Sequence, residues 1–212
     1  MKLPVIIIGG GGHAKVLIEA LRLNGIKIIG IIEAEPSFVG KQVLGITVIG
    51  NNDMISKYKP TDVELVNGIG SVSLPLKRKA IFERFKSLGF MFAKVIHPSA
   101  IIASDVFIGE GAQIMAGTII QPESRIGCNT IVNTKVSVDH DCIIGDHTHL
   151  APGVTLSGRV KIGNETHVGI GANLIQGVKV GRSVVIGAGA LVLNDILDEV
   201  IAIGVPAKVM QK

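Results

Sequence analysis

Hydrophobic residues recur at every sixth position through the second half of the chain, beginning at Ile96. A helix cannot use this period, because its 3.6 residues per turn would carry the apolar positions around its whole surface. Short strands joined by turns can use it, with each anchor pointing inward and a small or β-branched residue four positions later. All seventeen anchors are aliphatic: Ile96, Ile102, Ile108, Ile114, Ile120, Ile126, Val132, Val138, Ile144, Leu150, Leu156, Ile162, Val168, Leu174, Val180, Ile186 and Val192.

A period of eighteen residues is nested in the period of six. It appears in five glycines, each directly after an anchor: Gly109, Gly127, Gly145, Gly163 and Gly181. Three six-residue faces therefore make one coil, which predicts a three-sided parallel β-helix with coils stacked about 4.8 Å apart. Seventeen faces correspond to between five and six coils, and no inserted loop interrupts residues 96–197.

The composition is typical of a folded chain with an aliphatic core. Aromatic residues make up 3% of the chain although 47% of it is hydrophobic, as small triangular coils require. A charged fraction of 18% and a mean hydropathy of +0.51 exclude a disordered chain. No apolar stretch reaches the roughly 18 residues of a membrane span, and the N-terminus lacks a small-residue cleavage site. We therefore expect a cytoplasmic protein with no membrane partner.

Charge and cysteine content exclude further classes. The net charge of +4 is modest and scattered, which argues against nucleic acid as a partner. Two cysteines are too few for a disulfide framework or a cysteine zinc site. Of these, Cys142 falls at an inward position of the repeat, so we do not expect it to act as a nucleophile.

The first ninety or so residues have a different pattern, in which aliphatic runs alternate with amphipathic segments. Residues 4–8 predict a buried strand, and a glycine turn leads from it into a helix, VLIEALRLNG, that ends at Gly25. Further strands are predicted within 26–32 and 62–70, and a second helix within 73–89. Alternating strands and helices favour a parallel sheet.

These patterns divide the chain into three predicted parts. A small Rossmann-like α/β domain is expected over residues 1–92 and an all-β parallel β-helix over residues 93–197. A closing tail is expected over residues 198–212.

The glycine turn has the form G-x-G-x-x-A, carried by Gly9, Gly11 and Ala14, with the acidic residue Glu33 about twenty positions later. Bare backbone at a helix N-terminus binds phosphate. Taken alone, the motif suggests an NAD-dependent oxidoreductase, but about ninety residues suffice for only one mononucleotide-binding half. A single nucleotide, such as a nucleotide-diphosphate sugar, is therefore expected. A glycine turn that binds nothing is the alternative.

Motifs from both halves together resemble one family, the hexapeptide-repeat sialic acid and sugar acetyltransferases. They are GGGGHAKV, the VNGIG turn, HPSA at the entry to the repeat, DHDCIIGDHTH within it, and the closing IGVPAK. The resemblance implies a left-handed β-helix, a homotrimer with sites between subunits, and acetyl-CoA as co-substrate. It further implies N-acetylation of a nucleotide-linked amino sugar, of the 4-amino type, for surface polysaccharide. O-acetylation of a sialic acid or other sugar, and a noncatalytic β-helix scaffold, remain alternatives.

The resemblance assigns the acceptor site to the first domain. It implies that the sugar nucleotide contacts six residues: Gly11, Gly12, His13, Glu33, Ala34 and Gly70. Where the family commonly has two aspartates after the second strand, this chain has Glu33 and Ala34. The contacts to the base and ribose therefore stay open.

Acetyl transfer needs a base that is effective near neutral pH, and histidine is the usual residue for this role. In the family, the residue that matches His140 is the proton acceptor, and Asp141 supports it. Adding one coil to His140 leads to Gly158, where a side chain would crowd the base and where a backbone N–H can stabilise the developing oxyanion. Asn133 matches another polar position of the family site and is expected to position the reacting groups.

His149 lies nine residues, or half a coil, after His140, so the two side chains should emerge on different sides of the β-helix. If both serve one reaction, the site lies between neighbouring subunits. The resemblance implies that His149, Ile170 and Ala188 contact acetyl-CoA, and we assign His167, which stacks above His149, to the same ligand. No metal is expected, because no carboxylate or cysteine shares this column.

Overall fold

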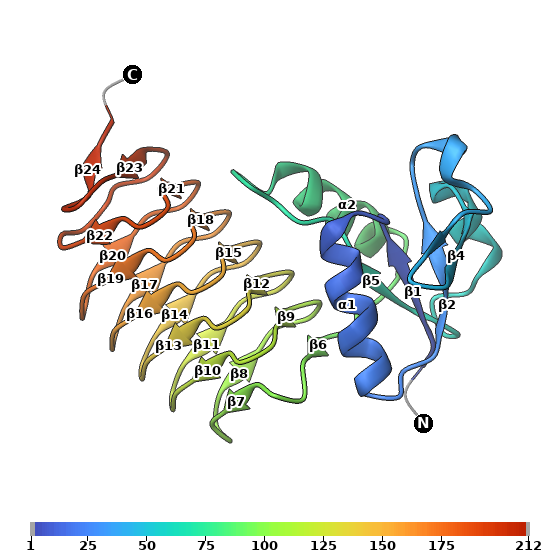
Figure 1. The fold of residues 1–212 in the computed structure, drawn as a ribbon, viewed down its shortest axis with the longest axis horizontal. Helices are drawn as coiled ribbons and strands as arrows, with labels where there is room; N and C mark the ends of the chain where they lie inside the picture. The colour runs from blue at the N-terminus through green and yellow to red at the C-terminus, as the bar shows by residue number, and fades with distance from the viewer. Residues whose placement is uncertain (1–2, 211–212) are drawn as a thin grey trace.

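A computed structural model describes residues 3–210 of the chain. The first two residues of the predicted 1–92 domain and the last two of the predicted tail lie outside the described residues. The chain forms an α/β domain beside a three-sided prism of stacked short strands (Figure 1). The expected fold class, an α/β domain followed by a left-handed β-helix of hexapeptide repeats, is confirmed.

The α/β domain is built on a five-stranded sheet with the order β3-β4-β2-β1-β5. All neighbouring strands are parallel except β3 and β4, which form a hairpin that the sequence pattern did not predict. The strands are β1 (Val5–Ile8), β2 (Ile28–Ile32), β3 (Gln42–Val43), β4 (Ile46–Gly50) and β5 (Glu64–Asn67).

Two helices, α1 (Gly12–Leu23) and α2 (Leu76–Ser87), cover opposite faces of this sheet. Successive residues of a strand point to opposite faces, so Val5 and Ile7 pack with α1 whereas Ile6 and Ile8 pack with α2. Helix α1 begins at Gly12 and not at Val16 as predicted, because the glycine turn itself forms the first helical turn. Two 3-10 helices, η1 (Pro36–Phe38) and η2 (Asn52–Lys57), connect the remaining strands.

The prism has three sides, and up to Val192 each side is a sheet of two-residue parallel strands that pair with the strand eighteen residues later, as His149 pairs with His167. Side 1 consists of β6 (Val95–Ile96), β9 (Gln113–Ile114), β12 (Ile131–Val132), β15 (His149–Leu150), β18 (His167–Val168) and β21 (Val185–Ile186), followed by β23 (Ile201–Ile203) and β24 (Lys208–Val209). The closing strands β23 and β24 pair antiparallel at the end of side 1. Side 2 consists of β7 (Ile101–Ile102), β10 (Ile119–Ile120), β13 (Ser137–Val138), β16 (Thr155–Leu156), β19 (Asn173–Leu174) and β22 (Leu191–Val192). Side 3 consists of β8 (Phe107–Ile108), β11 (Arg125–Ile126), β14 (Ile143–Ile144), β17 (Lys161–Ile162) and β20 (Lys179–Val180).

The second residue of each repeat strand fills the interior of the prism, as the period of six predicts. The anchors from Ile114 to Val192 are at most 4% exposed. The glycines that follow the anchors at every eighteenth residue allow the coils to stack closely. A Cβ on Gly127 would lie 2.5 Å from the backbone carbonyl carbon of Gly145 in the next coil, so no side chain fits there.

Helix α2 joins the two parts by lying along the corner of the prism between sides 3 and 1. Lys86 bonds Glu110 at 2.9 Å and Lys79 bonds Glu165 at 2.8 Å, which are contacts to different coils of the prism. The Phe82 ring packs edge to face on His147 between them, with centroids 5.5 Å apart. These contacts hold the α/β domain at one position along the prism.

Candidate functional site

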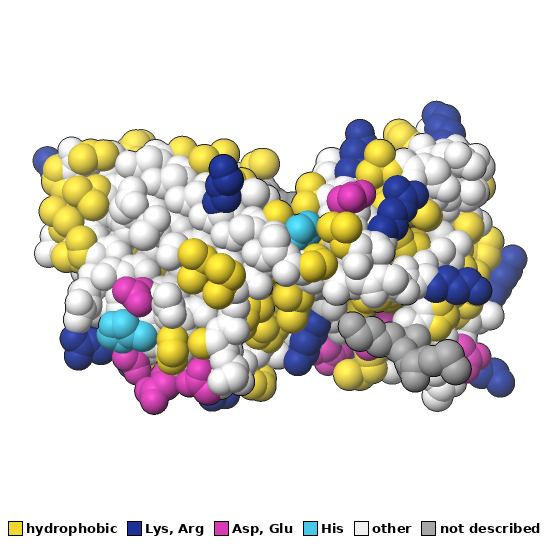
Figure 2. Space-filling view, turned by 60° about the horizontal axis from the view of Figure 1, so that its bottom comes forward, with side chains coloured by type: hydrophobic (Ala, Val, Ile, Leu, Met, Phe, Trp, Pro, Cys, Tyr) yellow, Lys and Arg dark blue, Asp and Glu magenta, His cyan; other side chains and the backbone are white. Residues whose placement is uncertain are grey.

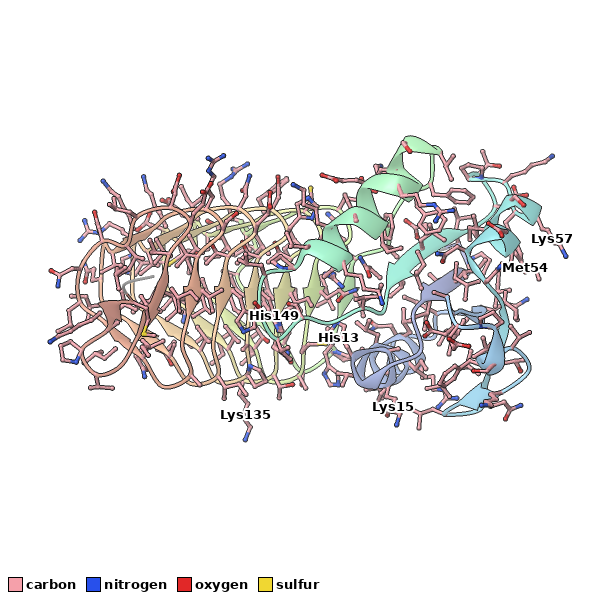
Figure 3. All side chains as sticks on the ribbon, turned by 90° about the horizontal axis from the view of Figure 1, so that it is seen from above. His13, Lys15, Met54, Lys57, Lys135 and His149 are labelled. Atoms are coloured by element: carbon pink, nitrogen blue, oxygen red, sulfur yellow. The ribbon has the colours of Figure 1, made fainter. Side chains whose placement is uncertain are left out.

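A cavity of about 610 Å³ lies where the α/β domain meets side 1 of the prism. Figure 3 shows His13 and His149 beside each other at this junction. Asn133 and His149 come from the prism, and most of the remaining wall comes from the N-terminus of α1, the end of β2, the β5–α2 loop and the first turns of α2. The cavity is lined by all six residues predicted to contact the acceptor: Gly11, Gly12, His13, Glu33, Ala34 and Gly70.

The N-terminus of α1 presents bare backbone to this cavity. No side chain caps the helix, its first turn holds no acidic residue, and a Cβ on Gly11 or Gly12 would meet no atom within 4 Å. The first N–H groups of a helix have no partner inside it and carry a partial positive charge. The end of α1 is therefore suited to bind an anion such as a phosphate.

Glu33 holds the glycine turn in place. Its Oε2 accepts a hydrogen bond from the Gly10 N–H at 2.7 Å, and its Oε1 accepts one from the Ala34 N–H at 2.9 Å. Each carboxylate oxygen has a further lone pair, so Glu33 can still accept a hydrogen bond from a hydroxyl of a ligand.

His13 is a neutral hydrogen-bond donor to the prism. The Gln113 side-chain amide donates to the Asn67 carbonyl at 2.8 Å, so its oxygen faces His13 Nε2, 2.7 Å away. A carbonyl oxygen only accepts, so His13 carries its proton on Nε2. Burial, reinforced by the charge of Arg78, lowers the pKa of His13 to about 4, although the bond to Gln113 opposes the shift.

His149 is also buried and neutral. Burial, followed by the charges of His167, His13 and Arg78, lowers its pKa to about 3, whereas a hydrogen bond with the Ser71 backbone opposes the shift. His149 Nδ1 lies 2.9 Å from Ser71 Oγ, and its Nε2 lies 3.1 Å from Asn133 Nδ2. The His167 ring stacks edge to face on it at 5.0 Å, as the spacing of eighteen predicts.

A second group of predicted residues lies at the corner between sides 2 and 3. Figure 2 shows one face of the molecule, on which a histidine lies among acidic side chains. His140 Nδ1 lies 2.6 Å from Asp141 Oδ2, and the His140 side chain is 50% exposed. The hydrogen bond from His140 holds the pKa of Asp141 below its usual value. A proton on Nδ1 leaves Nε2 free to accept another, which is the geometry of a general base with an orienting carboxylate.

Gly158 lies directly beside the free nitrogen of His140. A Cβ at this position would be 2.6 Å from His140 Nε2, so the expected crowding is real. Within residues 3–210, the Gly158 N–H donates no hydrogen bond. A base and an unused backbone donor therefore meet at this corner, as an oxyanion site requires.

The structure does not bring all predicted catalytic residues together within the chain. Asn133 lies at the corner before β13 and bonds His149, whereas His140 lies at the corner after β13. The cavity includes Asn133 and His149 but not His140. Pro152 lies one coil above the corner that follows Asn133. Ile170 and Ala188 occupy the same corner one and two coils above Pro152, so they continue upward from the cavity. The Ile170 side chain is 61% exposed.

Sequence reasoning missed several residues that shape the cavity. Ser71 lines it from the loop between β5 and α2, directly after the VNGIG turn, and Lys77 lines it from the first turn of α2. Arg78 is fully buried and donates to the carbonyls of Asn67, Ile69 and Asn129, which ties the loop to the prism. Burial lowers its pKa to about 9. No pattern in the sequence marked this residue.

The described residues offer little support for a metal site or for a nucleophilic thiol. Across residues 3–210, no three His, Cys, Asp or Glu side chains are grouped as a metal site would need. Cys142 is buried in the prism, and burial raises the pKa of its thiol to about 11, which keeps it protonated. None of the helices among these residues is long and apolar enough to cross a membrane.

Two family models match the chain. Residues 4–85 match the model described as the PglD N-terminal domain, and residues 123–158 match the bacterial transferase hexapeptide model with six repeats. Over 161 residues, the chain is 27% identical to the GDP-perosamine N-acetyltransferase of Escherichia coli O157:H7, covering 73% of this chain and 70% of that protein. Over 70 residues, or 31% of this chain, it is 37% identical to the bifunctional protein GlmU of Heliobacterium modesticaldum, but spans only 15% of that protein.

Solved structures match over nearly the whole chain. A histidine variant of the perosamine N-acetyltransferase from Caulobacter crescentus, in complex with CoA and GDP-perosamine, is 39% identical with a TM-score of 0.92. The match covers 99% of this chain and 97% of that chain. The acetyltransferase domain of PglB from Neisseria gonorrhoeae FA1090, in complex with acetyl coenzyme A, is 34% identical with a TM-score of 0.91, covering 99% and 100%.

Proposed function

Because this chain belongs to the family of hexapeptide-repeat acetyltransferases with a PglD-type N-terminal domain, we propose that it acetylates the amine of a nucleotide-linked amino sugar with acetyl-CoA. The observation that carries the proposal is the cavity between the domain and the prism. It combines an uncapped helix N-terminus for a diphosphate with a wall of the prism that holds His149. Relatives that match the whole chain bind CoA together with GDP-perosamine, which supports both substrates.

The diphosphate of the acceptor binds at Gly11 and Gly12, where the free N–H groups of α1 and the exposed Lys77 provide positive charge. The sugar then extends toward the prism, past His13 and Gly70, which lie against each other on the cavity wall. Glu33 and Ala34 lie toward the nucleoside, where the free lone pairs of Glu33 accept from a ribose hydroxyl.

Acetyl-CoA binds along the prism, with His149 lowest, His167 and Ile170 one coil higher, and Ala188 one coil above Ile170. These residues form a continuous strip from the cavity up the corner of the prism. In this arrangement His149 lies close to both substrates, because it also lines the acceptor cavity.

The reaction is a direct transfer. His140 Nε2 takes a proton from the attacking amine while the nitrogen forms a bond to the thioester carbonyl carbon, and Asp141 stabilises the imidazolium. The Gly158 N–H donates to the oxyanion. The C–S bond then breaks, and His140 returns its proton to the CoA thiolate, so the products are the N-acetyl sugar and free CoA.

The placement of His140 outside the cavity supports a homotrimer with shared sites. The outward residues of side 2 carry no charge, unlike those of side 3, which include Arg125, Lys161 and Lys179. Side 2 is therefore the side best suited to pack against copies of itself. A threefold arrangement of side 2 brings the corner of His140 on one subunit beside the Asn133 corner of the next. The outward residues of side 2 are Ile101, Ile119, Ser137, Thr155, Asn173 and Leu191.

A substrate screen tests the proposal. The purified protein is incubated with acetyl-CoA and a panel of GDP-, UDP- and dTDP-linked amino sugars, and thiol release is followed, with mass spectrometry of the product. Acetyl on the sugar nitrogen is expected. Acetyl on oxygen, or equal transfer to free amino sugars, would show that the acceptor is assigned wrongly. We place this reaction in the cytoplasm, where acetyl-CoA is available.

A further inference from the structure

Three side chains form a hydrogen-bonded line along one wall of the cavity. Asn133 Nδ2 lies 3.1 Å from His149 Nε2, and His149 Nδ1 lies 2.9 Å from Ser71 Oγ. Asn133 and His149 belong to the prism, whereas Ser71 belongs to the loop between β5 and α2. All three residues line the cavity.

The direction of each hydrogen bond follows from one backbone contact. The Thr134 N–H donates to Asn133 Oδ1 at 2.8 Å, and a backbone N–H can only donate. The amide oxygen of Asn133 is therefore the acceptor of that bond, and its NH₂ group faces His149. His149 Nε2 must accept from this NH₂ group, so it carries no proton.

A neutral imidazole with an unprotonated Nε2 has its proton on Nδ1. His149 is only 5% exposed, which favours the neutral ring. The Nδ1–H therefore donates to Ser71 Oγ. The opposite tautomer would set the Nε2–H against the Asn133 NH₂ group, with two donors facing each other.

This arrangement determines what the Ser71 hydroxyl can do. Its oxygen accepts from His149, so its own proton points away from the ring. Within residues 3–210 the Ser71 side chain has no second partner, and it is half-buried at the cavity wall. Neither cavity histidine has an N–H left for a ligand, because His13 donates to Gln113 and His149 to Ser71.

We infer that Ser71 determines acceptor specificity by donating its hydroxyl proton to an oxygen of the bound nucleotide sugar, in an orientation set by Asn133 and His149. The inference rests on the proposed function in that the cavity binds the acceptor. It differs from the proposed contact of His149 with acetyl-CoA, since it gives His149 a positioning role toward the acceptor. The oxygen belongs to the diphosphate or to a sugar hydroxyl, and both offer the same acceptor chemistry.

The first test is binding and kinetics of Ser71→Ala, with Ser71→Thr, which keeps the hydroxyl, and Ser73→Ala, an exposed serine of the same loop, as controls. Ser71→Ala should raise the KM for the nucleotide sugar about tenfold, the effect of one hydrogen bond to a strongly accepting oxygen. The KM for acetyl-CoA should not change, and both controls should resemble the wild type. An unchanged acceptor KM in Ser71→Ala would overturn the inference.

Titration calorimetry with GDP or UDP alone locates the contact. Weaker binding of the nucleoside diphosphate to Ser71→Ala assigns the contact to the diphosphate, and an effect limited to the nucleotide sugar assigns it to the sugar. If the wild type binds these nucleotides without acetyl transfer, the proposed function fails while the binding comparison still decides the role of Ser71.

The tautomer of His149 gives a readout that does not depend on activity. Nitrogen-15 NMR of the wild-type protein at neutral pH distinguishes protonated from unprotonated ring nitrogens, and the proton should be on Nδ1. In Asn133→Ala the ring is free to move its proton to Nε2, and the Ser71 hydroxyl then turns toward Nδ1. The acceptor KM of Asn133→Ala should rise as in Ser71→Ala, and the double variant should be no worse. A wild-type proton on Nε2, or additive effects in the double variant, would contradict the inference.

Discussion

Replacing Gly158 with alanine places a methyl group where the proposed base now lies. The new Cβ would be 2.6 Å from His140 Nε2 and 2.7 Å from Cε1, whereas an ordinary contact is at least 3.4 Å. The ring must therefore move by about 0.8 Å. Because the His140 side chain is 50% exposed, it can rotate outward at little cost in stability.

The expected loss is in turnover and not in folding. A displacement of about 1 Å of a reacting group can cost about 10²-fold in rate, and complete loss of general-base catalysis costs about 10² to 10⁴-fold. We expect kcat of Gly158→Ala to fall about 10²-fold and the free energy of unfolding to change by less than about 0.5 kcal/mol. The variant retains the backbone N–H at position 158, so the oxyanion donor is still present.

Steady-state kinetics by thiol release, together with urea denaturation, measure both quantities. Ser104→Ala, an exposed position on the same corner three coils below Gly158, is the matched control and should resemble the wild type. A double variant with His140→Ala should be no slower than His140→Ala alone, because the methyl group acts through the ring. Wild-type turnover in Gly158→Ala, or a further loss in the double variant, would refute the reasoning.

Three further predictions test the other features of the site. Mixed trimers of His140→Ala and His149→Ala subunits should recover activity, because one interface then receives both intact histidines. Activity no higher than in either pure variant would exclude a shared site. Arg78→Met should lower the free energy of unfolding by about 3 kcal/mol in urea, because the Asn129 and Ile69 carbonyls lose their donor and the Asn67 carbonyl keeps only its bond from Gln113. An unchanged midpoint would contradict this role. The free energy of unfolding should fall as the pH drops below 6.5. Burial, together with His167, His13 and Arg78, lowers the pKa of His149 to about 3. His149 therefore stays neutral in the folded protein but gains a proton in the unfolded chain. At pH 5 this linkage lowers the free energy of unfolding by about 2 kcal/mol for His149 alone. In urea denaturation, His149→Gln should therefore lose less of its free energy of unfolding between pH 7.5 and pH 5 than the wild type. An equal loss would count against a neutral buried ring.

The amino-acid sequence by itself determined the prism and its register. A strict period of six without insertions allows only one stacking of the coils, so adding eighteen to a residue number gives its neighbour in the next coil. This arithmetic placed Gly158 above His140 and His167 above His149, and the structure confirms both contacts. The family resemblance that the glycine turn carries likewise predicted Gly11, Gly12 and His13 as site residues, and all three line the cavity.

The tertiary structure alone decided how the α/β domain is placed on the prism. The contacts of Ser71 with His149, Lys79 with Glu165 and Arg78 with Asn129 join residues that lie 78, 86 and 51 positions apart. No period relates these residues, because they belong to two units with different repeats. Hydrogen-bond direction, and with it the tautomer of each buried histidine, depends on the packing of side chains from both units and therefore becomes defined only when the two units are docked.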